Sequence, residues 1–512
     1  MTSATTSRTA APLLGPRENR IVWLLLAAAF VAILNETTMG VAIPHLIDDL
    51  GITALAAQWL TTAFMLTMAV VIPITGFLLR RFTTRQVFIT AMSLFSLGTL
   101  IAVLAPGFGV LLVARVVQAM GTAIMMPLLM TTLMTIVPAH SRGRMMGRVS
   151  IVMSLAPAIG PTLSGVLLET LSWRWIFGIV LPIALVALAM GARWIQNLGE
   201  TTHAPIDVLS IVLSAFGFGG IVYGLSQIGG AAAHGATEAE TAAQSSSTVA
   251  LVVSFVVGII ALGLFLWRQV LLQRADAALL DLRVFRDRNF SLAIGQMALL
   301  SLAFFGTITV LPLYMQRALE YNALETGLAV LPGSLLMGVA GPFIGRIYDA
   351  RGTRVLLVPG AILAVAVLWV FALTFTATTP IWFIVIAQTV LSLGLALSFT
   401  PLFTASLGSL QPRFYAYGSA VLGTVQQVAG AAGIAVMITV MSAVSATAQE
   451  TGVVETAAEA QGAHAAFLLA AIISVPLLIG AFLIRKPDDV PGAPGEAPAE
   501  AEGAAQGAPV GH

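Results

Sequence analysis

The sequence predicts an all-α membrane protein that crosses the bilayer many times, and its composition is the first observation behind that prediction. Of its 512 residues, 58% are hydrophobic and only 9% are charged, and the mean hydropathy is +0.96. A soluble domain carries roughly a quarter of charged residues, because it must cover itself with solvated groups. A chain of this length could not hide so much apolar side chain from water, so we expect lipid to be its solvent.

The second observation is a series of stretches without charge, each able to supply a transmembrane helix of about twenty residues. They are residues 50–79, 86–114, 149–168, 175–192, 208–237, 241–267, 289–316, 326–345, 355–412 and 414–449. Turn signals at Ala105-Pro106-Gly107 and Thr378-Thr379-Pro380 divide two of them. With residues 21–44, the rest of the fourth helix to about Leu133, and residues 464–484, we expect fourteen helices.

The third observation is the placement of the basic residues, which are all Arg except Lys486. If the N-terminus lies inside, only Arg174 and Arg317 fall in outer segments and Arg115 falls within a span. This asymmetry follows the positive-inside rule and predicts that both termini are cytoplasmic, in the inner membrane of a cell. The segments 229–248 and 443–463 are then expected to be outer loops.

Charge and residue usage exclude several kinds of site. The formal net charge of +1 gives no reason to expect a nucleic-acid partner. Without Cys and with six scattered His, the chain offers no disulfide, no thiolate nucleophile and no metal cage. We therefore expect no cofactor, no metal and no catalytic residue, and a monomer in the lipid bilayer.

An internal repeat suggests two related halves. Residues 76–85 read GFLLRRFTTR and residues 345–354 read GRIYDARGTR, and each segment follows an apolar span, the second and the tenth in our count. Two six-helix halves separated by two extra helices place the segments there. Halves of this kind are common in secondary transporters, with the substrate site between them.

Several segments have recognisable patterns. Residues 345–354 fit the signature G-x-x-x-D-x-x-G-x-R in full, and residues 115–121 (RVVQAMG) are similar to R-x-x-Q-G-x-G. Residues 156–165 read APAIGPTLSG, and the stretches WRWIF and LPLYMQ begin at residues 173 and 311. Through these motifs, residues 20–485 resemble the major facilitator superfamily, and within it the fourteen-helix drug:proton antiporters of the EmrB/QacA type. In that family they are the cytoplasmic loop signature, the fourth-helix motif, the fifth-helix antiporter motif and two further matching stretches.

Two departures from the family pattern stand out. In the first cytoplasmic loop Arg80 replaces the usual Asp and Thr83 replaces a Gly, so the usual charge contact of that loop is in doubt. In the first helix, Asn35 stands at the usual Asp position and an acid follows as Glu36. This Asn-Glu variant is similar to the subgroup of lincosamide-type resistance exporters.

The resemblance implies a major facilitator fold and a division of the chain. We expect a cytoplasmic tail (1–20), an N-terminal six-helix half (21–195), two linking helices (196–275), a C-terminal six-helix half (276–485) and a disordered cytoplasmic tail (486–512).

Glu36 is the carboxylate that we place well inside a span, where an acid is costly and by default marks a proton or substrate site. A solvated position near the outer surface is the alternative. Asn35 points elsewhere, because neighbours on a helix diverge by about 100°. Arg115 lies at a similar depth, and we consider both a direct pair with Glu36 and a purely structural role, since spacing gives depth but not rotation. These three residues are our candidates for proton coupling.

Other candidates follow from the motifs. The two loop signatures supply conformational candidates: Gly76, Arg85, Gly345, Asp349, Gly352 and Arg354. In the fifth helix, Gly160 and Pro161, with small residues four apart, permit close packing and a kink. A purely structural role in helix packing is the alternative, and it differs little from the conformational role.

A cavity for amphipathic molecules needs apolar, adaptable walls and a few polar anchors, and Met suits such walls. The wall candidates are Met125, Met126, Met153, Phe304 and Phe305. The anchor candidates are Gln118, Gln296, Gln388 and Gln427. Lipid contact or helix packing also explains each Met or Phe, and bonding between helices also explains each Gln.

Taken together, these patterns predict a proton-coupled exporter of small amphipathic drugs or antibiotics, including cationic ones. A dedicated exporter of one metabolite, such as a self-made antibiotic or siderophore, is an alternative. A membrane-bound enzyme would need clustered His, Asp and Glu at a membrane face, and a channel would need a filter-like repeat. ATP-driven transport would need a G-x-x-x-x-G-K-[ST] loop. The sequence has none of these.

Overall fold

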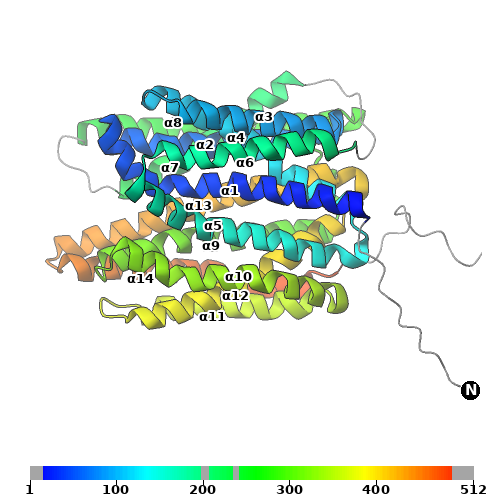
Figure 1. Ribbon diagram of the computed structural model, residues 1–512. Coiled ribbons are helices and arrows are strands. Elements are labelled where there is room, and N and C mark those ends of the chain that lie inside the picture. Colours follow the sequence, from blue (N-terminus) through cyan, green and yellow to red (C-terminus); the bar gives the residue numbers. More distant parts are fainter. Residues whose placement is uncertain (1–14, 198–206, 234–240, 487–512) are drawn as a thin grey trace, which may run out of the picture.

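The computed structural model describes residues 15–197, 207–233 and 241–486, and helices make up nearly all of this part of the chain. Fourteen of its helical segments are long and apolar enough to cross a membrane, which is the count that the sequence predicted. Figure 1 shows that they run side by side in one bundle. The tails at 1–14 and 487–512, and residues 234–240 of the connection predicted at 229–248, lie outside the described residues.

The first six helices form the N-terminal half. They are α1 (Pro16–Leu50), α2 (Ala54–Arg81), α3 (Thr84–Val103), α4 (Phe108–Ile136), α5 (Arg142–Thr170) and α6 (Arg174–Trp194), with a short 3₁₀ turn, η1 (Ala139–Ser141), before α5. The predicted break at Ala105-Pro106-Gly107 separates α3 from α4. α1 extends beyond the predicted 21–44 because Gly15 and Glu18 cap its start and Gly51, at φ 61°, ends it.

Two extra helices and the C-terminal half follow. The extra pair is α7 (Val208–Ala233) and α8 (Thr241–Leu272). Short 3₁₀ segments, η3 (Gln273–Ala275) and η4 (Leu282–Arg286), lead into the second half. That half comprises α9 (Arg288–Arg317), α10 (Ala323–Arg351), α11 (Arg354–Thr374), α12 (Ile381–Gly408), α13 (Tyr415–Glu450), α14 (Glu455–Ser474) and α15 (Pro476–Leu483), with η5 (Pro412–Phe414) before α13. The last span was predicted as one helix and is divided between α14 and α15 at Pro476.

Local capping explains where several helices begin. The Thr83 hydroxyl accepts a hydrogen bond from the Gln86 amide at the start of α3 (3.3 Å), and the Gln86 side chain accepts one from the Thr83 amide (3.1 Å). Asn322 and Glu325 form the same reciprocal box at the start of α10. Such boxes satisfy two amide groups that a helix leaves unpaired.

The two halves meet through matched helix pairs. α5 packs against α10, and α2 packs against α13. α7 contacts both α2 and α13, so the extra pair lies beside the junction of the halves, and α8 packs on α7. Arg268 of α8 donates two hydrogen bonds to Asp207, just before α7 (2.7 and 2.9 Å). These bonds hold the pKa of the Asp207 carboxyl below its usual range.

Four glycines let α5 and α10 touch backbone to backbone. Gly143 and Gly147 on α5 face Gly341 and Gly345 on α10. A Cβ on Gly341 would lie 2.6 Å from the Gly147 carbonyl oxygen, and one on Gly143 would lie 2.6 Å from the Gly345 carbonyl oxygen. Each helix therefore carries a G-x-x-x-G pair, a spacing that permits close approach in membranes. The contact lies at the end of the bundle that holds most arginines, which we call the arginine-rich end.

This contact yields a first prediction. Gly147→Ala places a methyl group against the α10 backbone, and overpacking of this kind costs about 1–3 kcal/mol. We expect the arginine-rich end to open. Spin labels on Arg20→Cys of α1 and Val355→Cys of α11, both exposed and on opposite halves, should move apart.

The matched control is Gly295→Ala on α9, where an added Cβ meets nothing within 4 Å. Its label separation should equal that of the parent. Equal separations in the parent and in Gly147→Ala would mean that the glycine contact does not hold this end closed.

Candidate functional site

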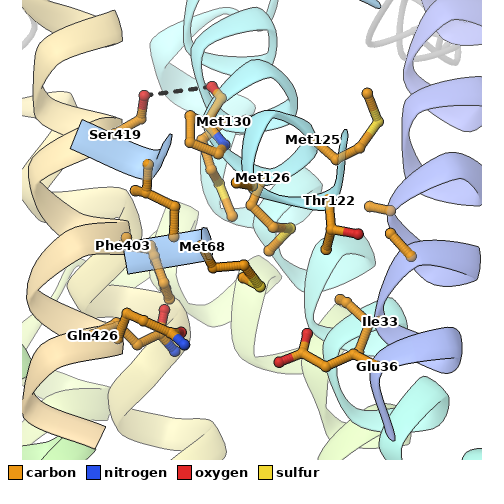
Figure 2. Close-up of a pocket in the computed structure, with 17 residues that line it drawn as sticks. Ile33, Glu36, Met68, Thr122, Met125, Met126, Met130, Phe403, Ser419 and Gln426 are labelled. Carbon is orange, nitrogen blue, oxygen red and sulfur yellow. Dashed lines mark hydrogen bonds between the residues drawn. The ribbon is translucent and has the colours of Figure 1, made fainter. Parts of the chain in front are cut away.

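A cavity lies between the two halves and is enclosed by α1, α2 and α4 from one half and by α12 and α13 from the other (Figure 2). Its volume is about 90 Å³. The lining residues are Ala29, Ala32, Ile33, Glu36, Met68, Ile72, Thr122, Ala123, Met125, Met126, Pro127, Met130, Phe403, Ser419, Gly423, Gln426 and Gln427. The wall is therefore mostly apolar and rich in Met, with a few polar groups.

Glu36 is the ionisable side chain among these lining residues. Figure 2 shows its carboxylate directed into the cavity, across from Gln426 of α13. In the part of the chain that the structure describes, the carboxylate takes part in no hydrogen bond and no ion pair. An unpaired acid in a membrane span is costly, so its surroundings favour a protonated or ligand-bound state.

Asn35 faces away from the cavity into a buried polar network. Its side chain is completely buried, and its Oδ1 accepts a hydrogen bond from Gln118 Nε2 at 3.5 Å. The same Gln118 nitrogen donates to the Thr99 hydroxyl at 2.9 Å. The divergence of neighbouring residues on a helix thus sends Asn35 to α4 and Glu36 to the cavity.

Arg115 completes this network and does not form an ion pair with Glu36 among the described residues. Its guanidinium donates to Gln118 Oε1 (3.1 Å) and to the Leu60 carbonyl (3.4 Å), and it lies 4.1 Å from the centre of the Phe64 ring. A carbonyl, an amide and an aromatic face therefore stabilise the buried cation. The direct pair that we considered is absent, because Arg115 points toward α2 while Glu36 points toward the cavity.

The fifth-helix motif packs behind the Glu36 turn of α1. A Cβ on Gly160 would lie 3.1 Å from the Thr37 Cβ, and Ser164 donates a hydrogen bond to the Thr38 carbonyl at 3.0 Å. α5 therefore approaches α1 closely at this level. The Pro161 side chain lies outside the described part of the structure.

Three of the predicted wall and anchor residues line the cavity: Met125, Met126 and Gln427. Six do not. Gln118 belongs to the buried network, and Met153 packs against the hydrophobic core. Gln296 of α9 donates to the Leu477 carbonyl of α15 at 2.7 Å, so it joins two helices.

The remaining three also lie elsewhere. Phe304 lines a second, apolar cavity within the C-terminal half and meets Phe399 edge to face. Phe305 packs on Gly430, and Gln388 is buried on α12. For the two Phe residues, helix packing is the interpretation that the geometry supports, whereas the Gln388 Oε1 atom has no hydrogen-bond partner in the described part of the chain.

Several lining residues were missed from the sequence. Thr122 and Met130 lie four residues before and after the predicted Met126, so the three share one face of α4, and this spacing could have identified the two that were missed. Gln426 adjoins the predicted Gln427. Met68 and Phe403 carry no comparable signal, because single apolar residues in a span are ordinary.

The arginine-rich end is closed by contacts between the halves. The Asp349 carboxylate of α10 accepts hydrogen bonds from the backbone amides of Gly143 (2.7 Å) and Arg144 (2.8 Å), at the start of α5. A carboxylate at a helix N-terminus satisfies free amides and meets the positive end of the helix dipole. Gly352, at φ 81°, ends α10 directly after this contact, in a backbone conformation that favours glycine.

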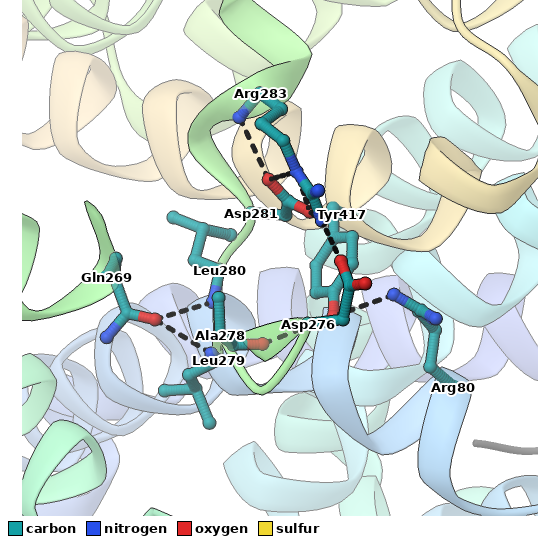
Figure 3. Close-up of polar contacts among 9 residues, drawn as sticks. All are labelled: Arg80, Gln269, Asp276, Ala278, Leu279, Leu280, Asp281, Arg283 and Tyr417. Carbon is teal, nitrogen blue, oxygen red and sulfur yellow. Dashed lines mark hydrogen bonds and ion pairs between the residues drawn. The ribbon is translucent and has the colours of Figure 1, made fainter. Parts of the chain in front are cut away.

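The first-half loop makes the corresponding contact with different chemistry (Figure 3). Arg80 of α2 donates to the Tyr417 hydroxyl of α13 at 3.2 Å, and this hydroxyl donates to the Ala278 carbonyl at 3.1 Å. Gly76 allows the approach, since a Cβ there would lie 3.0 Å from the Tyr417 ring. One hydroxyl thus joins α2, α13 and the segment that follows α8.

Charged groups hold that segment in shape (Figure 3). Arg283 bonds to both Asp281 and Asp276, and its hydrogen bond holds the pKa of the Asp276 carboxyl below its usual range. Gln269 Oε1 accepts from the amides of Leu279 (2.7 Å) and Leu280 (3.1 Å). The segment is therefore a fixed connection and not a loose one. The other two signature candidates, Arg85 and Arg354, are exposed near the starts of α3 and α11.

Two related helical halves with a cavity between them, closed at one end, define a membrane transporter. Residues 25–434 match the family model described as Major Facilitator Superfamily. The chain belongs to the major facilitator superfamily, as the sequence motifs predicted.

Individual relatives place the chain more narrowly within the superfamily. The chain is 40% identical to the lincomycin resistance protein LmrB of Listeria monocytogenes, over 91% of this chain and 96% of that protein. It is 43% identical to the MFS-type transporter YcnB of Bacillus subtilis, over 91% and 95%. The human organic anion transporter MFSD10 shares the fold, with a TM-score of 0.64 and 13% identity over 92% of this chain and 100% of that one.

The Asp349 contact gives a second prediction. Asp349→Asn keeps one acceptor oxygen and loses the charge, and hydrogen bonds to charged groups are worth about 1.5–3 kcal/mol. The closed arginine-rich end should lose about this much stability and open more often. The separation of labels at positions 20 and 355 should shift toward longer distances, and substrate turnover should slow.

Asp287→Asn is the matched control, because Asp287 caps α9 within one half through the Phe290 amide (2.7 Å). It should leave the label separation unchanged. If Asp349→Asn behaves like Asp287→Asn, the cap on α5 has no role in closure.

Proposed function

We propose that this protein exports amphipathic drugs or antibiotics across the cytoplasmic membrane in exchange for protons. The observation that carries the proposal is Glu36, an unpaired carboxylate in a Met-rich cavity between the two halves. The relatives of this chain include lincomycin resistance proteins, which supports a role in drug resistance.

Glu36 suits an exchange of proton for substrate. Ionised, the carboxylate attracts a cationic molecule; protonated, it lowers the cost of closing an apolar cavity around it. The buried network of Arg115, Gln118 and Asn35 lies on the side of α1 that faces away from the cavity. It keeps a positive charge near Glu36 without forming an ion pair with the Glu36 carboxylate. Loss of the proton to one side and uptake from the other would couple the two flows.

The cavity has to change shape during transport. Ligand pockets for drug-sized molecules hold about 300–1,000 Å³, which exceeds the space between the halves here. We infer that the arginine-rich end, closed by the α5–α10 glycines, Asp349 and Tyr417, opens and closes in alternation with the opposite end. The division into two halves of residues 21–195 and 276–485 is the mechanical unit of this proposal.

Orientation supplies a third prediction, with the arginine-rich end in the cytoplasm. The chain is free of Cys, so single cysteines at Thr378 (α11–α12 turn) and Gln411 (before η5), both exposed and at opposite ends, report topology. An impermeant maleimide should label Thr378→Cys in intact cells and Gln411→Cys only after lysis. The reverse pattern would refute this orientation.

The role of Glu36 gives a fourth prediction. Glu36→Gln keeps the shape but cannot release a proton, so pH-driven drug efflux in proteoliposomes should fall at least about tenfold, or about 1.4 kcal/mol. Glu36→Asp should keep partial activity with a shifted pH dependence, because its carboxylate is shorter by one methylene. Drug-induced proton release is measured alongside efflux.

Glu169→Gln is the control. Glu169 is an exposed carboxylate near the end of α5, away from the cavity and at the end of the bundle opposite the arginine-rich end. It should retain parental efflux and proton release. Undiminished pH-driven efflux by Glu36→Gln would remove Glu36 from the mechanism.

A further inference from the structure

The cavity holds, on two facing walls, polar side-chain groups that have no hydrogen-bond partner among the described residues. Glu36 lies on α1, and Gln426 and Gln427 lie on α13. The Nε2 atom of Gln427 is buried and has no hydrogen-bond partner in the part of the chain described. No hydrogen bond to Glu36 or Gln426 occurs there either.

Of the four Gln side chains that are buried in the described residues, three are bonded, and the fourth, Gln388, has an unpartnered Oε1 atom away from the cavity. Gln118 bonds to three side chains, Gln269 bonds to Ser210 and two backbone amides, and Gln296 bonds to the Leu477 carbonyl. Their bonds fix neighbouring helices. A buried amide donor without a partner is costly. Other described amides also have an unpartnered atom (Asn35 Nδ2, Gln273 Nε2 and Gln388 Oε1), but of these residues Gln427 is the one that lines the cavity. The Gln427 donor is therefore better explained by a molecule that occupies the cavity.

The two polar sites are separated by apolar surface. Figure 2 shows Glu36 and Gln426 on opposite sides, with Met68 in the space between them. Met126 and Phe403 extend this surface. An occupant that satisfies both sites must therefore have an apolar body with a polar group at each end.

We propose that the cavity recognises its substrate at two points, with Glu36 binding a basic amine and Gln427 donating a hydrogen bond to an oxygen acceptor. This inference rests on the proposed function and names its substrate class: amphipathic amines that also carry a carbonyl, amide or hydroxyl oxygen. Gln426, beside it, is a second donor or acceptor for the same end. A permanent cation without such an oxygen uses the Glu36 end alone.

The charge of the site sets a further limit on the class. Glu36 is the ionisable group of the lining, and Arg115 is turned away toward Leu60 and Gln118. An anionic head group would face the carboxylate with no cation in contact. The class is therefore amines and not acids.

The test compares binding of two probes to purified full-length protein in detergent. Lincomycin has a basic amine, an amide and hydroxyl groups, whereas tetraphenylphosphonium is a cation without hydrogen-bonding groups. Gln427→Met removes the donor at similar volume, so the Kd for lincomycin should rise about five- to twentyfold, as for one lost hydrogen bond. The Kd for tetraphenylphosphonium should change less than about twofold. Glu36→Gln should weaken both.

Two further variants keep the result interpretable. Gln388→Met removes a buried Gln that lies outside the cavity and should leave both Kd values unchanged. Gln427→Asn retains a shorter amide and should restore part of the lincomycin affinity. Unchanged tetraphenylphosphonium binding also reports that each variant of Gln427 and Gln388 is folded.

The inference is overturned if Gln427→Met affects both probes equally, if it affects neither, or if the parent binds neither probe. Binding in detergent requires no pH gradient, so the result of this binding test is independent of whether the protein carries out proton-coupled efflux. A parent that binds lincomycin selectively through Gln427 but shows no pH-driven efflux would refute proton-coupled export and leave the two-point site standing.

Discussion

The structure depends on one constraint: in lipid, a polar group must find its partner inside the protein. Arg115 meets it with a carbonyl, an amide and an aromatic ring, and Asp349 meets it with two backbone amides of the other half. Glu36 and the Gln427 amide lack such a partner among the described residues, and both face the cavity. Other unpartnered atoms, such as Asn35 Nδ2 and Gln388 Oε1, lie elsewhere, so the coincidence of unpartnered groups with a cavity is what locates the site.

The fold was largely predictable because its signals are long and redundant. Each span needs about twenty apolar residues, so charged residues and Pro-Gly turns divide the chain nearly unambiguously. Thr378-Thr379-Pro380 separated α11 from α12 as expected. The division at Pro476 was missed, because a Pro within an apolar run either kinks a helix or ends it, and the sequence does not distinguish the two.

The candidate site was only partly predictable because sequence spacing gives depth and not rotation about a helix axis. Asn35 and Glu36 share a depth, yet one joins a buried network and the other lines the cavity. Gln296 and Gln427 look alike as polar residues in apolar spans, but the first reaches a carbonyl on α15 and the second reaches none. The role of Arg80 needed the structure, since Tyr417 lies 337 positions further along the chain.

The glycine contact between α5 and α10 determines how steeply the packing at this end responds to helix separation. Side chains at an interface can change rotamer and keep a gap filled as two helices drift apart. Gly143, Gly147, Gly341 and Gly345 have no side chain to make such an adjustment, so a gap of about 0.5–1 Å already forfeits a quarter to a half of the dispersion attraction between the facing atoms. The contact therefore weakens steeply as the two helices separate, and this end favours two discrete arrangements over a gradual widening.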